Sequence, residues 1–285
     1  MVRRTIIIFL AILFFTSNSN AQNLRVISLY PGHSDNIYAL SRENNILIAL
    51  SENDDNDLLQ DLPRISLRAN AEKLLALNPD VVITRPFAEK LNPNLYNVLK
   101  ISGVKIISLE PPKWENFPDY LKTLAQELNL NPEFALQKLE IIKNNISQKA
   151  HEKIASGKKI PVVFIESTSR EIHTCTPDSW AANLIKLAGA KNYAENVQPL
   201  RNGSSVAPFG IERVLKSLDN GLNIYIIQNG AMNNTSLKDF YSRHWTEVFK
   251  TKNIKVAEIP EKYLSRPSLL GLEIGGDLLL KLFYE

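Results

Sequence analysis

The sequence has almost no thiol chemistry, since Cys175 is the single cysteine among 285 residues. A framework of intrachain disulfides needs pairs of cysteines and is therefore excluded, although an exported protein could form one. A chain of this length can bury a core that is stable without such cross-links. We expect Cys175 to be a small buried hydrophobic residue.

The sequence also lacks an excess of charge of either sign. The formal net charge is +3, and without Arg3 and Arg4 the remaining 31 basic residues face 30 acidic ones, which leaves +1. A near-neutral chain offers neither the basic surface that binds nucleic acids nor a polybasic membrane segment. Both classes of partner are therefore disfavoured.

The first 21 residues have the pattern of a secretory signal peptide. Arg3 and Arg4 precede an apolar run from Ile6 to Phe15, and the small residues of Ser19–Ala21 suit a cleavage site. The apolar run is too short to span a bilayer, and no cysteine near the cleavage point offers a lipid anchor. We expect residues 1–21 to be removed and the mature protein to be periplasmic.

Short apolar runs rich in β-branched residues alternate with helix-length segments along the mature chain. The expected strands are Arg25–Leu29, Ile46–Leu50, Val81–Thr84, Val104–Leu109, Val162–Ile165, Ile224–Ile227 and Ile254–Ile259. The expected helices are Asp35–Leu40, Ala71–Leu77, Pro93–Ile101, Trp114–Leu128, Ser179–Leu187, Ile211–Leu218, Ser236–Phe249 and Pro267–Phe283. Continuous apolar runs are typical of parallel strands covered on both faces, so the pattern predicts an α/β fold.

One longer helix interrupts this alternation and divides the chain. Apolar residues recur at helical spacing from Asn131, a candidate N-cap followed by Pro132, to about Ala155, and Gly157 can end the helix. About 25 helical residues would extend roughly 37 Å, the length of a domain. We therefore predict an N-terminal α/β lobe at 22–130, a connecting helix at 131–157 and a C-terminal α/β lobe at 158–285.

The two predicted lobes contain a weak internal repeat. The segments "AEKLLALNPDVVIT" (71–84) and "IERVLKSLDNGLNIYIIQ" (211–228) both place a glutamate at a helix start, then a turn and a buried strand. The glutamates are Glu72 and Glu212. Each lobe should therefore present one carboxylate at an equivalent position.

The stretch "SLYPGHSDN" (28–36) gathers the residue types of a serine hydrolase within a few positions. Chain neighbours cannot align a nucleophile, a base and an acid, and the Gly-x-Ser-x-Gly pattern is missing. We interpret Pro31-Gly32 as a turn and Ser34 as the N-cap of a helix with Asp35 in its first turn. This strand-to-helix turn lies at the edge where α/β sheets place ligands.

Taken in order, these segments resemble a known family. The stretches "RVISLYPGHSDNIYALS", "NAEKLLALNPDVVITRP" and "LKISGVKIISLEPP", the long helix, and then "AGAKNYAEN", "GIERVL" and "SRPSLLGLE" resemble the periplasmic solute-binding proteins of ABC importers for cobalamin and ferric siderophores. The resemblance implies two Rossmann-like lobes, each with a mainly parallel sheet, joined by one long helix with the ligand between them. It also implies that Glu72 and Glu212 dock on arginines of the membrane permease.

Residues that follow the strands are the candidates for binding this ligand. The expected set is Tyr30, Gly32, His33, Asp55, Arg85, Phe87, Trp114, Ser179, Trp180, Asn229, Met232 and Arg266. Aromatic rings can form flat walls for a corrin or a catecholate, and arginines can neutralise an anionic chelate. We favour Arg85 and Arg266, whereas Trp180 could equally belong to the core.

A site for a bare metal ion is disfavoured. His33 is the only histidine placed near the expected cleft, and the pair His173 and Cys175 has nothing obvious to complete a tetrahedral site. We expect no cofactor and no catalytic residue. The bound ligand is expected to be a cobalt corrinoid or a ferric chelate.

The sequence therefore predicts a monomeric periplasmic binding protein rather than an enzyme. It would capture a metal chelate and deliver it to a permease dimer with its ATPase subunits. A secreted α/β enzyme is the alternative, which would need a positioned nucleophile, base and acid or a metal cage. A sensor subunit of the same fold that does not transport is the third interpretation.

Overall fold

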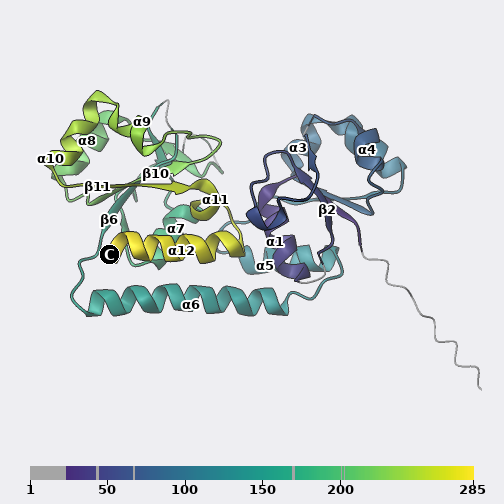
Figure 1. Ribbon diagram of the computed structural model, residues 1–285, viewed down its shortest axis with the longest axis horizontal. Coiled ribbons are helices and arrows are strands. Elements are labelled where there is room, and N and C mark those ends of the chain that lie inside the picture. The colour runs from purple at the N-terminus through teal and green to yellow at the C-terminus, as the bar shows by residue number, and fades with distance from the viewer. Residues whose placement is uncertain (1–23, 43–44, 67, 169–170, 200, 202) are drawn as a thin grey trace, which may run out of the picture.

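A computed structural model describes residues 24–285 with the exception of 43–44, 67, 169–170, 200 and 202. Two α/β lobes stand side by side above one long helix (Figure 1). The predicted signal peptide lies outside the described residues. Within them, no helix combines the length and apolar character needed to cross a membrane.

The N-terminal lobe is built on a five-stranded sheet in the order β3-β2-β1-β4-β5, in which every pairing is parallel. Its strands are β1 Val26–Ser28, β2 Leu47–Ser51, β3 Arg64–Ile65, β4 Val81–Thr84 and β5 Lys105–Ser108. Its helices are α1 Pro31–Ser41, the 3₁₀ turn η1 Asp57–Leu59, α2 Ala71–Leu75, α3 Pro86–Leu91, α4 Pro93–Ile101 and α5 Phe117–Glu127.

Both faces of this sheet are covered, which explains why its strands are continuously apolar. In β1, Val26 packs with Ile37 of α1 on one face, and Ile27 packs with Leu74 of α2 and Leu99 of α4 on the other. All of these side chains are buried. The strand interior therefore has no position at which a polar side chain would reach water.

The C-terminal lobe repeats this plan with a parallel sheet in the order β11-β10-β6-β8. Its strands are β6 Val162–Glu166, β8 Lys191–Asn192, β10 Ile224–Asn229 and β11 Lys255–Pro260, and β7 His173–Cys175 pairs antiparallel with β9 Val206–Pro208. Its helices are α7 Trp180–Leu187, α8 Ile211–Asp219, α9 Leu237–Tyr241, η2 His244–Thr246, α10 Glu247–Thr251, α11 Glu261–Leu264 and α12 Leu269–Tyr284. The predicted α/β class with two parallel-sheet lobes is confirmed.

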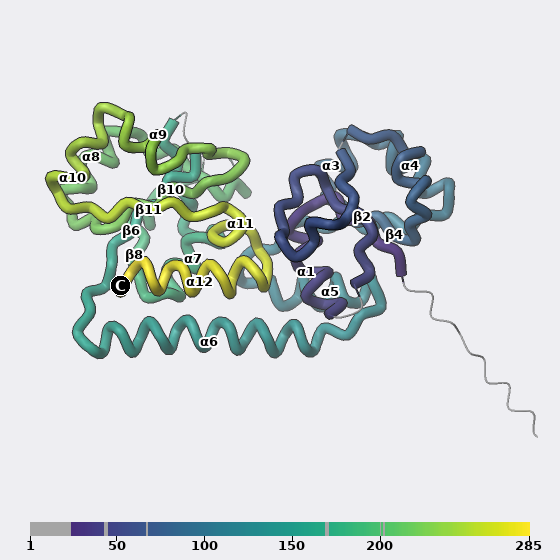
Figure 2. Tube along the Cα trace, viewed as in Figure 1, coloured from purple at the N-terminus to yellow at the C-terminus, as the bar shows by residue number. Residues whose placement is uncertain are grey.

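The connecting helix is α6, Glu133–Ala155, which lies within the predicted segment. It runs beneath the C-terminal lobe, and its start reaches α1 and α5 of the N-terminal lobe (Figure 2). The helix begins at Glu133 with Pro132 as its N-cap, so the predicted N-cap at Asn131 is one residue too early. Asn131 Oδ1 nevertheless accepts the backbone N–H of Glu133 at 2.9 Å. α6 packs along α12, where a Cβ at Gly276 would lie 2.1 Å from Ile146. Glycine at that position lets the two helices approach closely.

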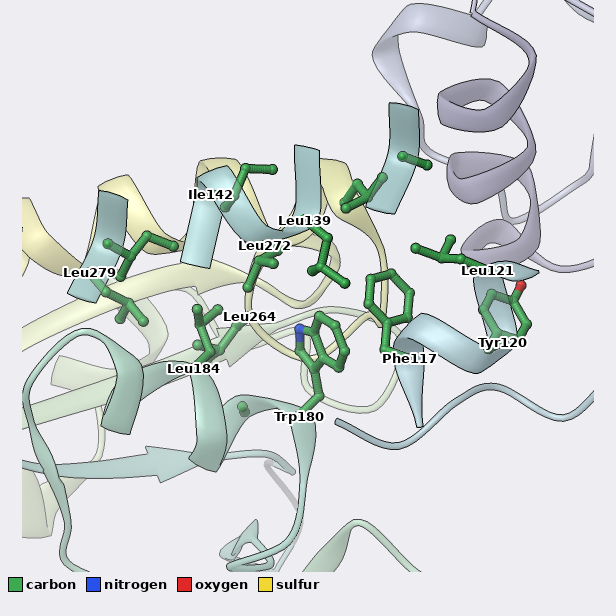
Figure 3. Close-up of a cluster of buried hydrophobic side chains, with 14 of the residues drawn as sticks. Phe117, Tyr120, Leu121, Leu139, Ile142, Trp180, Leu184, Leu264, Leu272 and Leu279 are labelled. Carbon is green, nitrogen blue, oxygen red and sulfur yellow. The ribbon is translucent and has the colours of Figure 1, made fainter. Parts of the chain in front are cut away.

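One hydrophobic core continues from lobe to lobe through α6 (Figure 3). Phe117 of α5 and Trp180 of α7 meet edge to face with ring centroids 5.0 Å apart, and Trp114 lies 4.8 Å from Trp180. Leu139 of α6 belongs to the same cluster. The lobes are therefore packed against each other and not merely tethered.

Two local predictions are wrong. Helix α1 begins at Pro31 with Tyr30 as its N-cap, so Pro31-Gly32 is not a turn and Ser34 is not a cap. Ser34 is fully buried in the helix and donates to Ser28 Oγ at 2.9 Å, and Asp35 lies beyond the first turn. The predicted helix at 236–249 is broken into α9, η2 and the start of α10.

Candidate functional site

The carboxyl ends of β1 and β4 place Tyr30 and Arg85 beside each other. The Arg85 guanidinium carbon lies 4.8 Å from the centroid of the Tyr30 ring, within the range of a cation–π contact. No described residue forms an ion pair with Arg85, and its Nε is buried without a hydrogen-bond partner. Burial raises the pKa of Tyr30, while the charges of Arg85 and Arg266 partly oppose that shift. The half-buried Arg85 side chain is therefore held against Tyr30, and its guanidinium makes no ion pair with another described residue.

Gly32 and His33 orient the Tyr30 ring. A Cβ at Gly32 would lie 2.8 Å from Tyr30 Cε1, so only glycine leaves room for the ring at this point of α1. His33 contacts the same ring edge to face at 4.9 Å. These two predicted ligand contacts are buried beneath Tyr30, where they support it.

His33 is held as a neutral imidazole. Its Nε2 lies 3.1 Å from the carbonyl oxygen of Leu109, which can only accept, so this nitrogen carries the proton. The other nitrogen, Nδ1, then accepts from the Tyr120 hydroxyl at 2.6 Å. Burial, with a smaller contribution from the nearby charge of Arg85, lowers the pKa of His33 to about 4. Both ring nitrogens are therefore used inside the lobe.

Arg266, which was expected to contact the ligand, joins the two lobes. Its Nη1 lies 2.7 Å from Asp55 Oδ1 and 3.7 Å from Asp35 Oδ2, both in the N-terminal lobe. Lys262 of α11 adds a second link, because its Nζ lies 3.1 Å from Asp57 Oδ2 and donates to the Asp55 carbonyl at 2.8 Å. Asp55 is thus in place, but its carboxylate is engaged by Arg266.

These links border a small crevice between the lobes, with a volume of about 150 Å³. Asp35 lines it and accepts from the Asn56 amide at 2.7 Å. Burial raises the pKa of Asp35 to about 6, although Arg266 opposes the shift. Sites for drug-sized ligands have volumes of roughly 300–1,000 Å³, so a bulky chelate does not fit this crevice.

The loop after β10 carries two more predicted ligand residues. Asn229 donates its amide to Glu258 at 2.6 Å, and Met232 is 58% exposed. Between them, the backbone of Gly230 is packed against the Glu261 side chain, since a Cβ there would lie 2.2 Å from Oε2. The loop is thus held by contacts with Glu258 and Glu261, and it exposes the apolar side chain of Met232.

The remaining predicted residues lie elsewhere. Trp114 and Trp180 belong to the core between the lobes, and Trp180 is only 5% exposed. Ser179 caps α7, with its Oγ accepting from the Ala182 N–H at 3.1 Å. Phe87, on α3, is 62% exposed. The structure therefore does not gather the predicted set into one enclosed pocket.

A larger groove that the sequence analysis missed lies on the C-terminal lobe, with a volume of about 750 Å³. Its walls come from the β7–β9 pair, the start of α8 and η2, and include His173, Phe209, Arg213, Arg243 and Trp245. The aromatic and basic residues flanking Glu212 in "PFGIER" are the one local signal that could have indicated it.

An ion pair connects Arg243, in the wall of this groove, with the carboxyl end of β6. Arg243 binds both carboxylate oxygens of Glu166, at 2.8 and 3.0 Å. Glu166 is the last residue of β6, is fully buried and also accepts from Tyr225 and Asn233. The charge of Arg243 is therefore balanced within the lobe. Arg213, whose guanidinium carbon lies 4.2 Å from the Phe209 ring centroid, forms no ion pair with a described residue.

The repeated glutamates occupy equivalent, exposed positions. Glu72 lies in the first turn of α2, which precedes β4, and Glu212 lies in the first turn of α8, which precedes β10. Neither forms an ion pair with any residue in the described part of the chain. Both carboxylates are thus available to a partner.

The described residues contain no group of three histidine, cysteine or acidic side chains that could hold a metal ion. Cys175 is buried, and burial raises the pKa of its thiol to about 11, which disfavours the reactive thiolate. Ser34 is inaccessible to a substrate because it is fully buried.

Comparisons with solved structures agree with this geometry. A possible iron-binding, periplasmic solute-binding protein from Staphylococcus epidermidis has 20% identity and a TM-score of 0.70, over 92% of this chain and 98% of that one. The periplasmic vitamin B12 binding protein of Vibrio cholerae has 19% identity and a TM-score of 0.59, over 91% and 96%. The periplasmic heme binding protein of the same organism has 19% identity and a TM-score of 0.65, over 90% and 99%.

At these identities the solved structures show a shared fold. No curated protein sequence matches the chain. The family model described as periplasmic binding protein matches residues 26–263, which include both lobes and α6. The family is one of binding proteins and not of enzymes, and it implies partnership with ABC transporter permeases. The chain belongs to the periplasmic binding protein family.

Proposed function

We propose that this protein captures a metal chelate in the periplasm and delivers it to an ABC importer permease. The candidate chelates are a corrinoid, a ferric siderophore or a heme, the classes that the family resemblance and the related structures suggest. A monomer would bind the chelate between the facing edges of the two sheets. The protein would then dock on a permease dimer that works with ATPase subunits.

The observation that carries this proposal is the guanidinium of Arg85, which lies over the Tyr30 ring and forms no ion pair with any described residue. Burying part of a cation without a partner is costly unless a ligand completes it. Because the other arginine at this edge, Arg266, already binds two carboxylates, Arg85 is the group left to meet an anionic chelate. A charge-assisted hydrogen bond from a guanidinium suits carboxylate, catecholate or phosphate oxygens.

Intrinsic fluorescence provides a direct test. The chain has three tryptophans, and two of them, Trp114 and Trp180, lie in the core between the lobes. Titration with cobalamin, cobinamide, ferric protoporphyrin and a panel of ferric siderophores should quench this emission for one class at micromolar concentration or below. No quenching and no heat of binding with any of these chelates would overturn the proposed function.

Delivery requires a second measurement. Vesicles containing the cognate permease and its ATPase subunits should accumulate the chelate only when the binding protein and ATP are present. Capture without any stimulated uptake would instead favour a sensor that retains the fold and the ligand.

A further inference from the structure

The amino ends of the strands in the C-terminal sheet carry lysines, at the edge opposite the candidate ligand residues. Lys191 begins β8, and its N–H donates to the carbonyl of Pro161, next to the start of β6, at 2.9 Å. Lys255 begins β11, and its N–H donates to the carbonyl of Asn223, just before β10, at 3.0 Å. Because the four strands are parallel, their starts lie in one row, with these two lysines at its ends.

Three helices end beside this row. Each of α6, α7 and α12 has one lysine in its last turn, namely Lys153, Lys186 and Lys281. A Cβ at Gly189, in the turn after α7, would lie 2.5 Å from the Tyr284 hydroxyl of α12 and 3.2 Å from Ile154 of α6. The three helix ends are therefore in contact, at the end of the molecule marked C in Figure 1.

The segment "GKKIP" (157–161) between α6 and β6 extends this basic surface. Its lysines are exposed and belong to no helix or strand. The segments 150–161, 186–191 and 281–285 together contain six lysines and two glutamates, Glu152 and Glu285, which leaves an excess of +4. We refer to the six lysines as the lysine end: Lys153, Lys158, Lys159, Lys186, Lys191 and Lys281. The net charge of the whole chain, from which the sequence analysis disfavoured a membrane contact, does not reveal this uneven distribution.

The protein itself balances only part of this charge. The last carbonyls of a helix carry a partial negative charge, which stabilises the lysines in the final turns of α6, α7 and α12. Lys158, Lys159 and Lys191 lie outside these turns. All six lysines are exposed, and none forms an ion pair with a described residue. An anionic partner would relieve the repulsion among them.

Exposed apolar side chains favour a lipid surface over a soluble polyanion. Ile160 directly follows Lys158 and Lys159 and is 44% exposed. Leu278 of α12, three residues before Lys281, is 38% exposed. The backbone of a nucleic acid or an acidic peptide offers charge without an apolar layer. A bilayer offers both, since lysines remain among the headgroups while an adjacent apolar side chain enters the boundary with the acyl chains.

We propose that the lysine end binds the surface of a bilayer that contains anionic phospholipids. Its lysines pair with lipid phosphates, and Ile160 inserts at the boundary between headgroups and acyl chains. Glu212 stays free, because α8 ends next to the start of β10 and its own start lies towards the other end of the sheet. The contact holds the protein at a membrane surface, where its search for a permease is confined to two dimensions. This inference goes beyond the proposed function and does not depend on which ligand is bound.

The test is cosedimentation with vesicles of phosphatidylcholine, prepared with and without phosphatidylglycerol at about one third of the lipid. The protein used begins at Gln22, because the apolar residues 6–15 would bind lipid on their own. At about 0.05 M salt it should bind only the vesicles that contain phosphatidylglycerol, and about 0.5 M salt should release it, since screening weakens contacts between exposed charges. No binding to either kind of vesicle, or equal binding to both, would overturn the proposal.

Substitutions locate the contact. Lys158→Gln with Lys159→Gln should weaken binding about 25-fold, since each lysine near an anionic surface contributes about fivefold. The matched control is Lys73→Gln with Lys90→Gln, which makes the same change in charge at exposed positions of the N-terminal lobe. It should change the affinity by less than about twofold. An equal loss in both variants would show that overall charge governs binding and would overturn the role of the lysine end.

Ile160→Gln tests the apolar part of the contact. This variant changes an exposed side chain and should weaken binding while leaving its salt dependence unchanged, because no charge is altered. Unchanged affinity would overturn the insertion of Ile160.

Soluble competitors separate lipid from other anions. Binding of polyglutamate without binding of vesicles would assign the lysine end to an acidic protein and overturn the lipid contact. Inorganic phosphate should displace the protein from vesicles no more than chloride does at equal ionic strength. Stronger displacement would indicate a discrete phosphate site in place of a surface contact. If vesicle binding fails while a chelate binds, the proposed function stands without this inference.

Discussion

Arg266 Nη1 of the C-terminal lobe lies 2.7 Å from Asp55 Oδ1 of the N-terminal lobe, and the same nitrogen lies 3.7 Å from the buried Asp35. The side chain of Arg266 is only 13% exposed. Arg266, which the sequence analysis predicted to contact the ligand, thus forms an ion pair between the lobes. Stability and ligand affinity should therefore respond to different arginines.

Replacing Arg266 should mainly lower stability. Arg266→Ala leaves Asp35, 3% exposed, without its cation, and breaking a buried ion pair costs roughly 3–5 kcal/mol. Urea unfolding at pH 7.5 should show a free energy of unfolding lower by about 3 kcal/mol. Lys100→Ala, which removes an ion pair with Glu89 that is half-exposed on the lysine side, should cost less than about 1 kcal/mol. Equal effects of the two changes would contradict the buried link.

Replacing Arg85 should have the opposite profile. Its guanidinium has no ion-pair partner among the described residues, so Arg85→Ala should leave the unfolding free energy within about 0.5 kcal/mol. Affinity for an anionic chelate should fall by about 1.5–3 kcal/mol, the value of a charge-assisted hydrogen bond. Tryptophan quenching measures this, and Lys90→Ala, at an exposed position of α3, is the matched control. Unchanged affinity in Arg85→Ala would remove this residue from the site.

Asp35 should impose a pH dependence on stability. Its pKa is raised by burial from 3.8 to about 6, so between these values the folded state binds more protons than the unfolded state. The contribution of Asp35 to stability is therefore present below about pH 4 and is lost as the pH rises to about 6. The slope approaches about 1.4 kcal/mol per pH unit at most.

Asp35→Asn should remove that loss. The difference in unfolding free energy, variant minus wild type, should increase from pH 4 to pH 6 and then level off. Urea unfolding at intervals of one pH unit measures it, and Asp119→Asn, at an exposed position of α5, should give a difference that varies much less. A constant difference for Asp35→Asn would contradict the raised pKa.

The fold could be predicted from the sequence because the sheets are buried on both faces. All four residues of β4, Val81–Thr84, are buried, and such runs stand out from the polar helix surfaces around them. The start of α1 could not be predicted. Pro31 suits the first turn of a helix, but Gly32 is required by the ring of Tyr30, which only the folded geometry reveals.

The candidate site was less predictable because it depends on partners that are distant in the sequence. No local pattern indicates that Arg266 meets Asp55, or that Trp114 meets Trp180 across the lobes. The predicted strand ends indicated where polar residues gather. They did not indicate which of those residues form ion pairs within the protein and which do not.

Glu72 and Glu212 should matter for delivery and not for capture. They lie at equivalent helix starts in the two lobes, are exposed, and have no ion-pair partner in the described part of the chain. Two separated carboxylates suit paired cationic pockets on a two-fold permease, where they would fix orientation and speed encounter. If they served only the helix dipoles, each would stabilise its helix by a few tenths of a kcal/mol. The double change Glu72→Lys with Glu212→Lys should therefore lower the free energy of unfolding by less than about 1 kcal/mol. It should leave the affinity for a chelate held at Arg85 within about twofold, because neither glutamate contacts Arg85.

Permease-stimulated uptake into vesicles should nevertheless be lost in this double variant, because the reversed charges would repel the cationic pockets. The matched control is Glu140→Lys with Glu195→Lys, which makes the same change in net charge at exposed positions on α6 and in the loop after β8. Because the control alters long-range charge equally, its uptake should remain close to that of the wild-type protein. Normal uptake by the Glu72 and Glu212 variant would show that these carboxylates serve only their helices, and equal loss in both variants would show that overall charge, and not docking at two points, governs the encounter.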